Sequence, residues 1–190
     1  MRYARNALAV IGALLLIAAY SIYSKGHDLT REMDARAKRA LGHFIVEVKD
    51  ADVARALMIR KPVAAGIDPA SAEQAIRQRA KELDLAVVGV RRHSLGTGGA
   101  VLKVVAFDFC NEQTLGAVLE LRPELGALFP CSLVLVSEPD GQGWMAMLDP
   151  ELLLYGGGPR DPALDTRILS IKDRMLDAMA AAAALKSPGN

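Results

Sequence analysis

Residues 133–148 read LVLVSEPDGQGWMAML, and this stretch predicts a β-hairpin. Two apolar runs flank the tripeptide Pro-Asp-Gly at 139–141, and that tripeptide is typical of a tight turn between two strands. A hairpin of this kind needs further strands or helices to cover it, because an isolated hairpin is marginally stable in water. The stretch therefore predicts the centre of a larger antiparallel sheet.

The turn also predicts which residues of the hairpin face one another. Leu135 is expected to face Met145, and Leu133 to face Met147, because directly opposed residues share one side of an antiparallel pair. Cys131, two residues before Leu133, is expected on the same side. The opposite side is apolar as well, which predicts that helices cover one face and a second copy of the chain or another partner covers the other. That candidate interface consists of Val134, Val136, Trp144 and Leu148.

Working outward from the hairpin, the periodicity of apolar residues predicts the other elements. Asp68-Pro69 and Asp161-Pro162 each combine an N-cap with a proline at the first helical position. We expect strands at 86–90, 101–109, 133–137 and 143–148, and helices at 68–83, 112–121, 150–154 and 161–184. The segment from about 30 to 60 is expected to form a helical hairpin or one long helix. This order predicts an α+β fold, with a mostly antiparallel sheet packed with helices, behind an N-terminal transmembrane helix.

The predicted anchor is the uncharged segment from Asn6 to Ser24. Its 19 residues, at 1.5 Å per residue, give roughly 28 Å, close to the thickness of the hydrocarbon core. Arg2 and Arg5 precede it, which favours a cytoplasmic N-terminus. A cleaved signal peptide is the alternative, with Ala19-Tyr20-Ser21 as a weak cleavage site.

The expected organisation has six parts. They are a cytoplasmic N-terminus (1–5), a transmembrane anchor (6–24), a helical stalk or linker (25–62), an α+β domain (63–158), a C-terminal helix (159–186) and a frayed tail (187–190). We expect a single-pass protein of a bacterial-type inner membrane with a periplasmic domain. The formal net charge is +1, and this balance gives no sign of the clustered basic surface that nucleic-acid binding needs. No nucleic-acid partner is therefore expected.

Several short motifs between Asp68 and Tyr155 resemble the domain-of-unknown-function family 302. They are the capped helix from Asp68 to Leu83, Phe109-Cys110-Asn111, Leu128-Phe129-Pro130-Cys131, and Asp140-Gly141 with Trp144. The tail Tyr155-Gly156-Gly157 is similar to a membrane-anchored, two-cysteine branch of the family. The resemblance implies a compact α+β domain that often pairs as a dimer, and it implies no activity.

Cys110 and Cys131 are the two cysteines of the chain. In an oxidising compartment they are expected to form a disulfide, provided that their strands are antiparallel. A functional redox pair is a second interpretation. A third is a copper(I) site that uses the cysteines with Met145 and Met147, since soft sulfur ligands suit that ion. Two free thiols are the fourth.

His43 and Met58 are a further pair of candidate ligands, for a non-covalently bound haem. The default expectation is that no cofactor is bound, with copper and haem as alternatives. No G-x-S-x-G elbow or apolar-flanked carboxylate pair is present, which favours a non-enzymatic role. Asp108 is expected to be exposed or paired rather than catalytic.

Together these features predict a membrane-tethered periplasmic accessory or binding protein. It would associate with itself or with a membrane complex, and an electron-transfer complex is one candidate. The alternative is a redox protein or a metal-handling protein that uses Cys110 and Cys131.

Overall fold

The computed structural model describes residues 2–31, 33, 35–48, 52–64, 66–97, 100–109, 112–128, 131–151, 154 and 161–185. The helices are α1 (Arg2–Arg31), α2 (Ala35–Val48), α3 (Val53–Ala56), α4 (Pro69–Glu82), α5 (Glu112–Leu121), the short 3-10 helix η1 (Pro123–Leu128) and α7 (Pro162–Ala183). The strands are β1 (Met58–Val63), β2 (Val87–Thr97), β3 (Ala100–Phe109), β4 (Cys131–Ser137) and β5 (Gly143–Leu148).

The five strands form one antiparallel sheet in the order β1-β5-β4-β3-β2, so the α+β prediction is confirmed. The register of the central hairpin is also as predicted, with Leu133 opposite Met147 and Leu135 opposite Met145. Its turn contains Gly141 at φ +84°, a backbone conformation that glycine adopts without steric cost. The Pro-Asp-Gly motif therefore predicted the pairing of β4 with β5 correctly.

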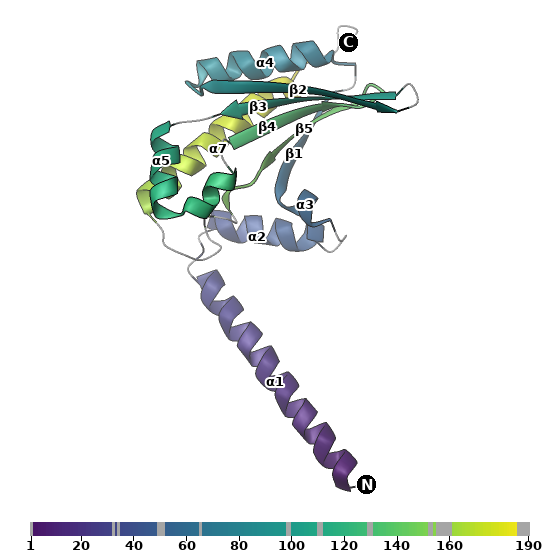
Figure 1. The fold of residues 1–190 in the computed structure, drawn as a ribbon, viewed down its shortest axis with the longest axis vertical. Coiled ribbons are helices and arrows are strands. Elements are labelled where there is room, and N and C mark those ends of the chain that lie inside the picture. The colour runs from purple at the N-terminus through teal and green to yellow at the C-terminus, as the bar shows by residue number, and fades with distance from the viewer. Residues whose placement is uncertain are drawn as a thin grey trace.

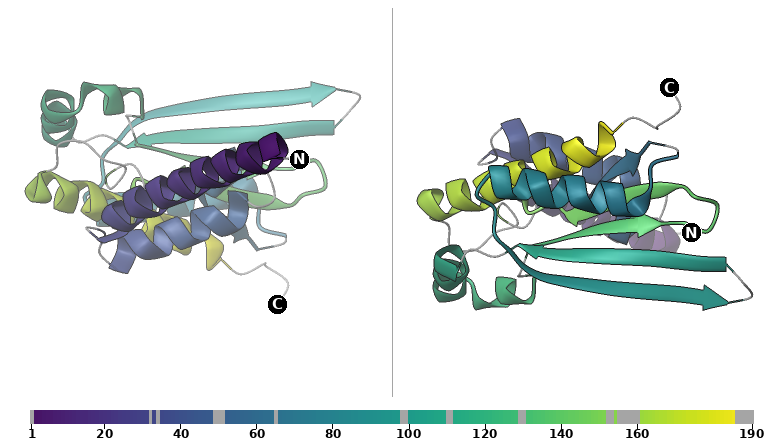
Figure 2. Two further views of the ribbon diagram at one scale, coloured as in Figure 1. Left: turned by 90° about the horizontal axis from the view of Figure 1, so that it is seen from below. Right: turned by 90° about the horizontal axis from the view of Figure 1, so that it is seen from above.

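Helices α4 and α7 cover one face of the sheet (Figure 2). Both begin as predicted: Asp68 accepts a hydrogen bond from the Ser71 amide, and Asp161 accepts one from the Ala163 amide. The two helices pack closely on each other because alanines lie along their contact. The core beneath them is formed by Ala72, Ile76, Ala80, Phe107, Phe109, Leu133, Leu135, Met145, Met147, Met175 and Met179.

Strand β1 contradicts the helix expected over about 30–60. Residues from Met58 onward pair with β5, in the register Met58 to Leu148 and Val63 to Gly143. The rest of the expected helical segment is divided among the end of α1, α2 and α3, so it is not one long helix. Residues 58–62 belong to the sheet. The expected helix at 150–154 falls partly outside the described residues.

Helix α1 projects away from the rest of the protein, next to α2 (Figure 1). α2 is held to the domain by a second apolar cluster, in which Met33 and Ala37 pack with Leu125, Leu154 and Ile168. Within the described part of the chain, no helix has both the length and the apolar character needed to cross a bilayer. The transmembrane anchor thus stays a prediction.

Candidate functional site

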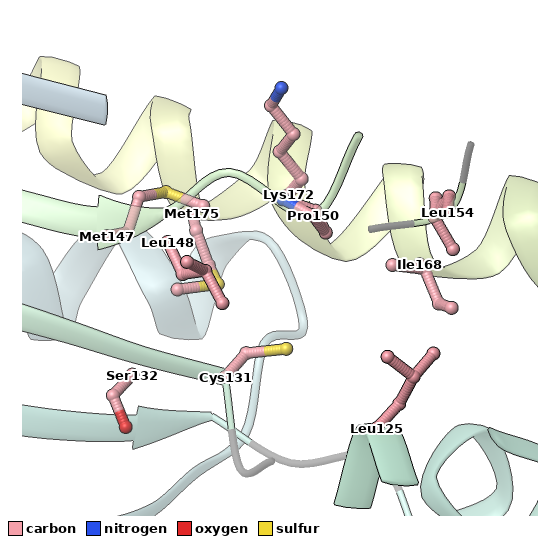
Figure 3. Close-up of a pocket in the computed structure, with 10 residues that line it drawn as sticks. All are labelled: Leu125, Cys131, Ser132, Met147, Leu148, Pro150, Leu154, Ile168, Lys172 and Met175. Atoms are coloured by element: carbon pink, nitrogen blue, oxygen red, sulfur yellow. The ribbon is translucent and has the colours of Figure 1, made fainter. Parts of the chain in front are cut away.

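A small cavity of about 50 Å³ lies where the ends of β4 and β5 meet α7. Its wall is almost wholly apolar, and Leu125, Leu154 and Ile168 close it on the side of η1. Figure 3 shows the Cys131 thiol pointing into this space, while the Lys172 ammonium group points away from it. The sheet places the thiol there because Cys131 shares the helix-covered face with Leu133 and Leu135.

Three sulfur-bearing side chains line this cavity, from three different elements. They are Cys131 of β4, Met147 of β5 and Met175 of α7. Of the two methionines predicted as soft ligands, Met147 is therefore beside the cysteine. Met145 is fully buried in the core and does not line the cavity. Met175 was not predicted as a ligand, because it follows Cys131 by 44 residues and no sequence spacing relates the two positions.

Cys110 lies outside the described residues, and no disulfide joins the residues that are described. The strands have the arrangement that a bridge needs: β3 and β4 are antiparallel, and Phe109 pairs with Cys131. Cys110 therefore follows directly after the residue opposite Cys131. The disulfide between the two cysteines stays a prediction.

A buried ionic cluster lies beside the same end of the sheet. Lys172 is 6% exposed, and its Nζ lies 2.7 Å from Asp149 Oδ1 and 2.9 Å from Glu151 Oε1. Arg36 of α2 contacts Glu151 at 3.0 Å and Asp173 of α7 at 2.8 Å. The hydrogen bond with Asp173 raises the pKa of the Arg36 guanidinium above its usual range, although burial acts against this.

This cluster joins segments far apart in the sequence, and the sequence pattern did not predict it. A buried lysine is costly unless carboxylates lie beside it, and Asp149 and Glu151 meet this need for Lys172. Because Arg36 lies on α2 and Asp173 on α7, the cluster attaches the N-terminal helical segment to the C-terminal helix.

His43 and Met58, the candidate haem ligands, line one groove between α2 and β1. The groove has a volume of about 400 Å³ and also includes Arg55, Lys61 and Trp144. A second hollow of about 610 Å³ adjoins it, because His43 and Arg60 line both. The structure thus brings the predicted pair to one groove from two separate elements. A role as haem ligands stays a prediction.

Val134 and Trp144 of the predicted interface lie on the face of the sheet opposite to α4 and α7, and both are half-buried in a single chain. Leu148, also half-buried, lines the Cys131 cavity at the end of β5 (Figure 3). Val136 is only 4% exposed, so it contributes less free apolar surface than the sequence suggested. The Arg60 guanidinium stacks on the Trp144 ring at 4.1 Å and covers part of that side chain.

Asp108 lies at the end of the same face and is paired, as expected. Arg91 donates to its two carboxylate oxygens at 3.0 and 2.8 Å, and the Ser132 hydroxyl donates at 2.7 Å. The Arg91 hydrogen bonds lower the pKa of Asp108, and the Ser132 hydrogen bond acts in the same direction against the effect of burial. Gly89 opposite leaves room for the carboxylate, since a Cβ there would lie 3.1 Å from Asp108 Oδ2.

In the described residues, no three His, Cys, Asp or Glu side chains gather in a way that would hold a metal ion. A thiol with two thioethers is a different donor set, and the Cys131 cavity is where the described residues bring one together.

Residues 59–182 match the family model of the domain of unknown function DUF302. The chain belongs to the DUF302 family. A crystal structure of an uncharacterised conserved DUF302 protein from Bacillus stearothermophilus is similar at 19% identity and a TM-score of 0.50. The match covers 66% of this chain and 98% of the other, and at this identity it shows the fold alone. No curated protein matches the chain.

The DUF302 match starts within β1 and ends within α7, whereas the sequence predicted the α+β domain over 63–158. The DUF302 match begins after α1, α2 and α3. Arg36 of the ionic cluster and His43 of the groove therefore come from a segment outside the DUF302 match. Both features join that segment to the family domain.

Proposed function

We propose that this DUF302 protein is a non-enzymatic accessory or binding protein that α1 tethers to a membrane. The observation that carries the proposal is the exposure of apolar side chains along α1. Its large apolar residues from Ile11 to Tyr23 are 54–74% exposed, which is a long apolar surface for a helix that projects from the domain (Figure 1). A bilayer would cover this surface.

The span from Ile11 to Tyr23 alone is shorter than the roughly 20 residues that a crossing needs. The proposed crossing therefore uses the whole uncharged segment from Asn6 to Ser24. Tyr20 and Tyr23 would lie at the interface, where amphipathic rings are favoured. Arg2 and Arg5 would stay on the cytoplasmic side and the domain would lie in the periplasm.

The proposed binding surface is the face of the sheet that α4 and α7 leave uncovered. Its half-buried apolar centre and the Arg91–Asp108 ion pair at its edge support self-association or contact with a membrane complex, an electron-transfer complex being one candidate. A second copy is the partner we propose first, because a two-fold contact needs one self-complementary surface only.

Membrane fractionation of cells that produce the full-length chain tests the tether. The wild-type protein should stay in the membrane pellet after washing with alkaline carbonate, and its intact mass should include α1. The double variant Leu15→Lys, Leu16→Lys should move to the soluble fraction. Val88→Lys alters an exposed apolar residue of the domain and should not. Wild-type protein in the soluble wash, or a mature form without α1, would contradict the proposal.

A redox or metal-handling role is the second candidate, and the cavity at Cys131 favours it. The thiol shares this cavity with the thioethers of Met147 and Met175 (Figure 3), and such a donor set prefers copper(I). Titration of the reduced full-length protein with copper(I) against a coloured chelator tests it. One ion bound per chain, lost in Cys131→Ser and weakened in Met175→Leu, would support this role. Absence of binding in the wild type would contradict it.

A further inference from the structure

The two adjoining hollows between α2 and β1 form one cationic groove. Its basic side chains come from α2, α3, β1 and α7, and four carboxylates share it. The cations are Arg36, Arg39, Arg55, Arg60, Lys61 and Lys172, and the carboxylates are those of Glu47, Asp149, Glu151 and Asp173. Six positive charges against four negative charges leave an excess of two.

The carboxylates of the groove are already engaged. Asp149 and Glu151 contact Lys172, Asp173 contacts Arg36, and Glu47 contacts Arg55 at 3.4 Å. By contrast, none of the described carboxylates forms an ion pair with Arg39, Arg60 or Lys61. These three cations outweigh the single negative charge left by the paired groups, in which three cations meet four carboxylates, and so account for the excess of two.

Arg60 is held in place before any ligand arrives. Its guanidinium stacks on the Trp144 ring at 4.1 Å, while its N–H donors remain available at the edge of the plane. Lys61 extends from the same edge strand, and its Nζ donates to the Leu176 carbonyl at 3.4 Å. The planar, fixed guanidinium of Arg60 is suited to a phosphate group, and Lys61, on the side of the strand that faces α7, adds positive charge nearby.

The position of the groove identifies the source of that phosphate. α1 leaves the domain at the end where α2 lies (Figure 1), so a membrane that holds α1 is next to the groove. Arg39 and Lys38, both exposed on α2, increase the positive charge on this side. Basic segments adjacent to a membrane helix attract anionic lipids.

We propose that the groove between α2 and β1 binds the phosphate of an anionic phospholipid headgroup. Arg60 contacts the phosphate, and Lys61 and Arg39 add positive charge around it. The site orients the domain on the bilayer surface in addition to tethering it. This inference rests on the proposed membrane attachment of α1.

Lipid selectivity of the full-length protein tests the inference. The chain is reconstituted into nanodiscs that contain a mixture of phosphatidylcholine and phosphatidylglycerol, and the lipids retained after gentle extraction are measured by native mass spectrometry. Wild-type protein should retain phosphatidylglycerol preferentially. Arg60→Gln and Arg39→Gln should each lower this preference about fivefold, the factor that corresponds to about 1 kcal/mol per basic residue near an anionic surface.

Arg92→Gln is the matched control, since it removes an exposed arginine on β2, the strand at the opposite edge of the sheet from β1. It should keep the wild-type preference. Equal retention of both lipids by the wild type, or an equal loss in Arg92→Gln, would overturn the headgroup site. Displacement by millimolar inorganic phosphate without any lipid preference would show that free phosphate is the ligand, and would also overturn it. Failure of the tether itself would appear separately, as protein that does not incorporate into nanodiscs.

Discussion

Arg36 and Asp173 form a two-point ion pair between α2 and α7, with Nη2 to Oδ1 at 2.8 Å and Nη1 to Oδ2 at 3.2 Å. The two residues are 137 positions apart in the sequence. A third contact, from Arg36 Nε to the buried Glu151, extends this pair into the Lys172 cluster. The helical segment that follows α1 is therefore fixed to the domain at a defined orientation.

Replacement of Arg36 by methionine should weaken this attachment. The free energy of unfolding should fall by about 1–2 kcal/mol, because a partly exposed ion pair contributes little but the buried Glu151 loses a charged donor. Urea denaturation followed by Trp144 fluorescence measures the change, and hydrogen exchange should rise in α2. Arg79→Met, which removes an exposed arginine that pairs with Glu82, should cost less than about 0.5 kcal/mol. Equal costs for the two variants would contradict the assignment.

Asp108 predicts a specific dependence of stability on pH. Arg91 and Ser132 lower the pKa of the folded carboxyl below the unfolded value of 3.8, so the ionised form stabilises the fold. This contribution is complete above about pH 4 and is lost as the pH falls through the lower folded pKa. Asp108→Asn should therefore melt at a lower temperature than wild type at neutral pH, and the difference should shrink in acid.

Ser132→Ala tests the same network with the carboxylate retained. Loss of the hydroxyl donor should bring the pKa of Asp108 closer to its ordinary value. The acid transition should then begin at a higher pH than in the wild type. Melting curves from pH 7 to about pH 2 measure both variants. A constant difference between Asp108→Asn and wild type over this range would refute the assigned role.

The two cysteines should be joined when the protein is isolated from an oxidising compartment. Phe109 pairs with Cys131, the first residue of β4, and Cys110 is the next residue after Phe109 in the sequence. A loop of about 20 residues closed by a disulfide contributes roughly 3 kcal/mol on the entropic model. Cys110→Ser should lower the melting temperature, and non-reducing peptide mapping should find the two peptides linked. Two freely alkylated thiols would sink the bridge and favour the metal-binding alternative.

Self-association should depend on the uncovered face of the sheet. Val134→Glu places a charge at the half-buried centre of that face and should shift the detergent-solubilised full-length protein from dimer to monomer in sedimentation. Val88→Glu introduces the same charge at an exposed position elsewhere and should leave the dimer intact. Circular dichroism checks that both variants fold. A wild-type protein that is monomeric at micromolar concentration would remove the basis for this interface.

The sequence predicted the hairpin correctly because its information is local. The Pro-Asp-Gly turn at 139–141 and the alternation of side chains along each strand determine which residues face one another. The same alternation places Cys131 on the side of Leu133 and Leu135. The two Asp-Pro helix starts are equally local. In each case neighbouring residues alone determine the conformation.

β1 was missed for the opposite reason. The segment MIRKPV contains two basic residues and a proline, and its strand conformation depends on β5 at the other end of the domain. The Cys131 cavity and the ionic cluster share this dependence, since Met175 and Lys172 reach them from α7. Sequence spacing carries no signal for side chains that meet only through tertiary packing.

The pairing of β1 with β5 also determines the order in which the chain can fold. Val63 pairs with Gly143, so β1 emerges from the ribosome well before its partner strand exists. During this interval an unpaired strand is exposed to other chains. Arg60, Lys61 and Pro62 reduce that hazard, because charge and a missing N–H donor oppose edge-to-edge pairing. Late closure of the sheet by its first strand makes the β1–β5 ladder the expected slow step of folding.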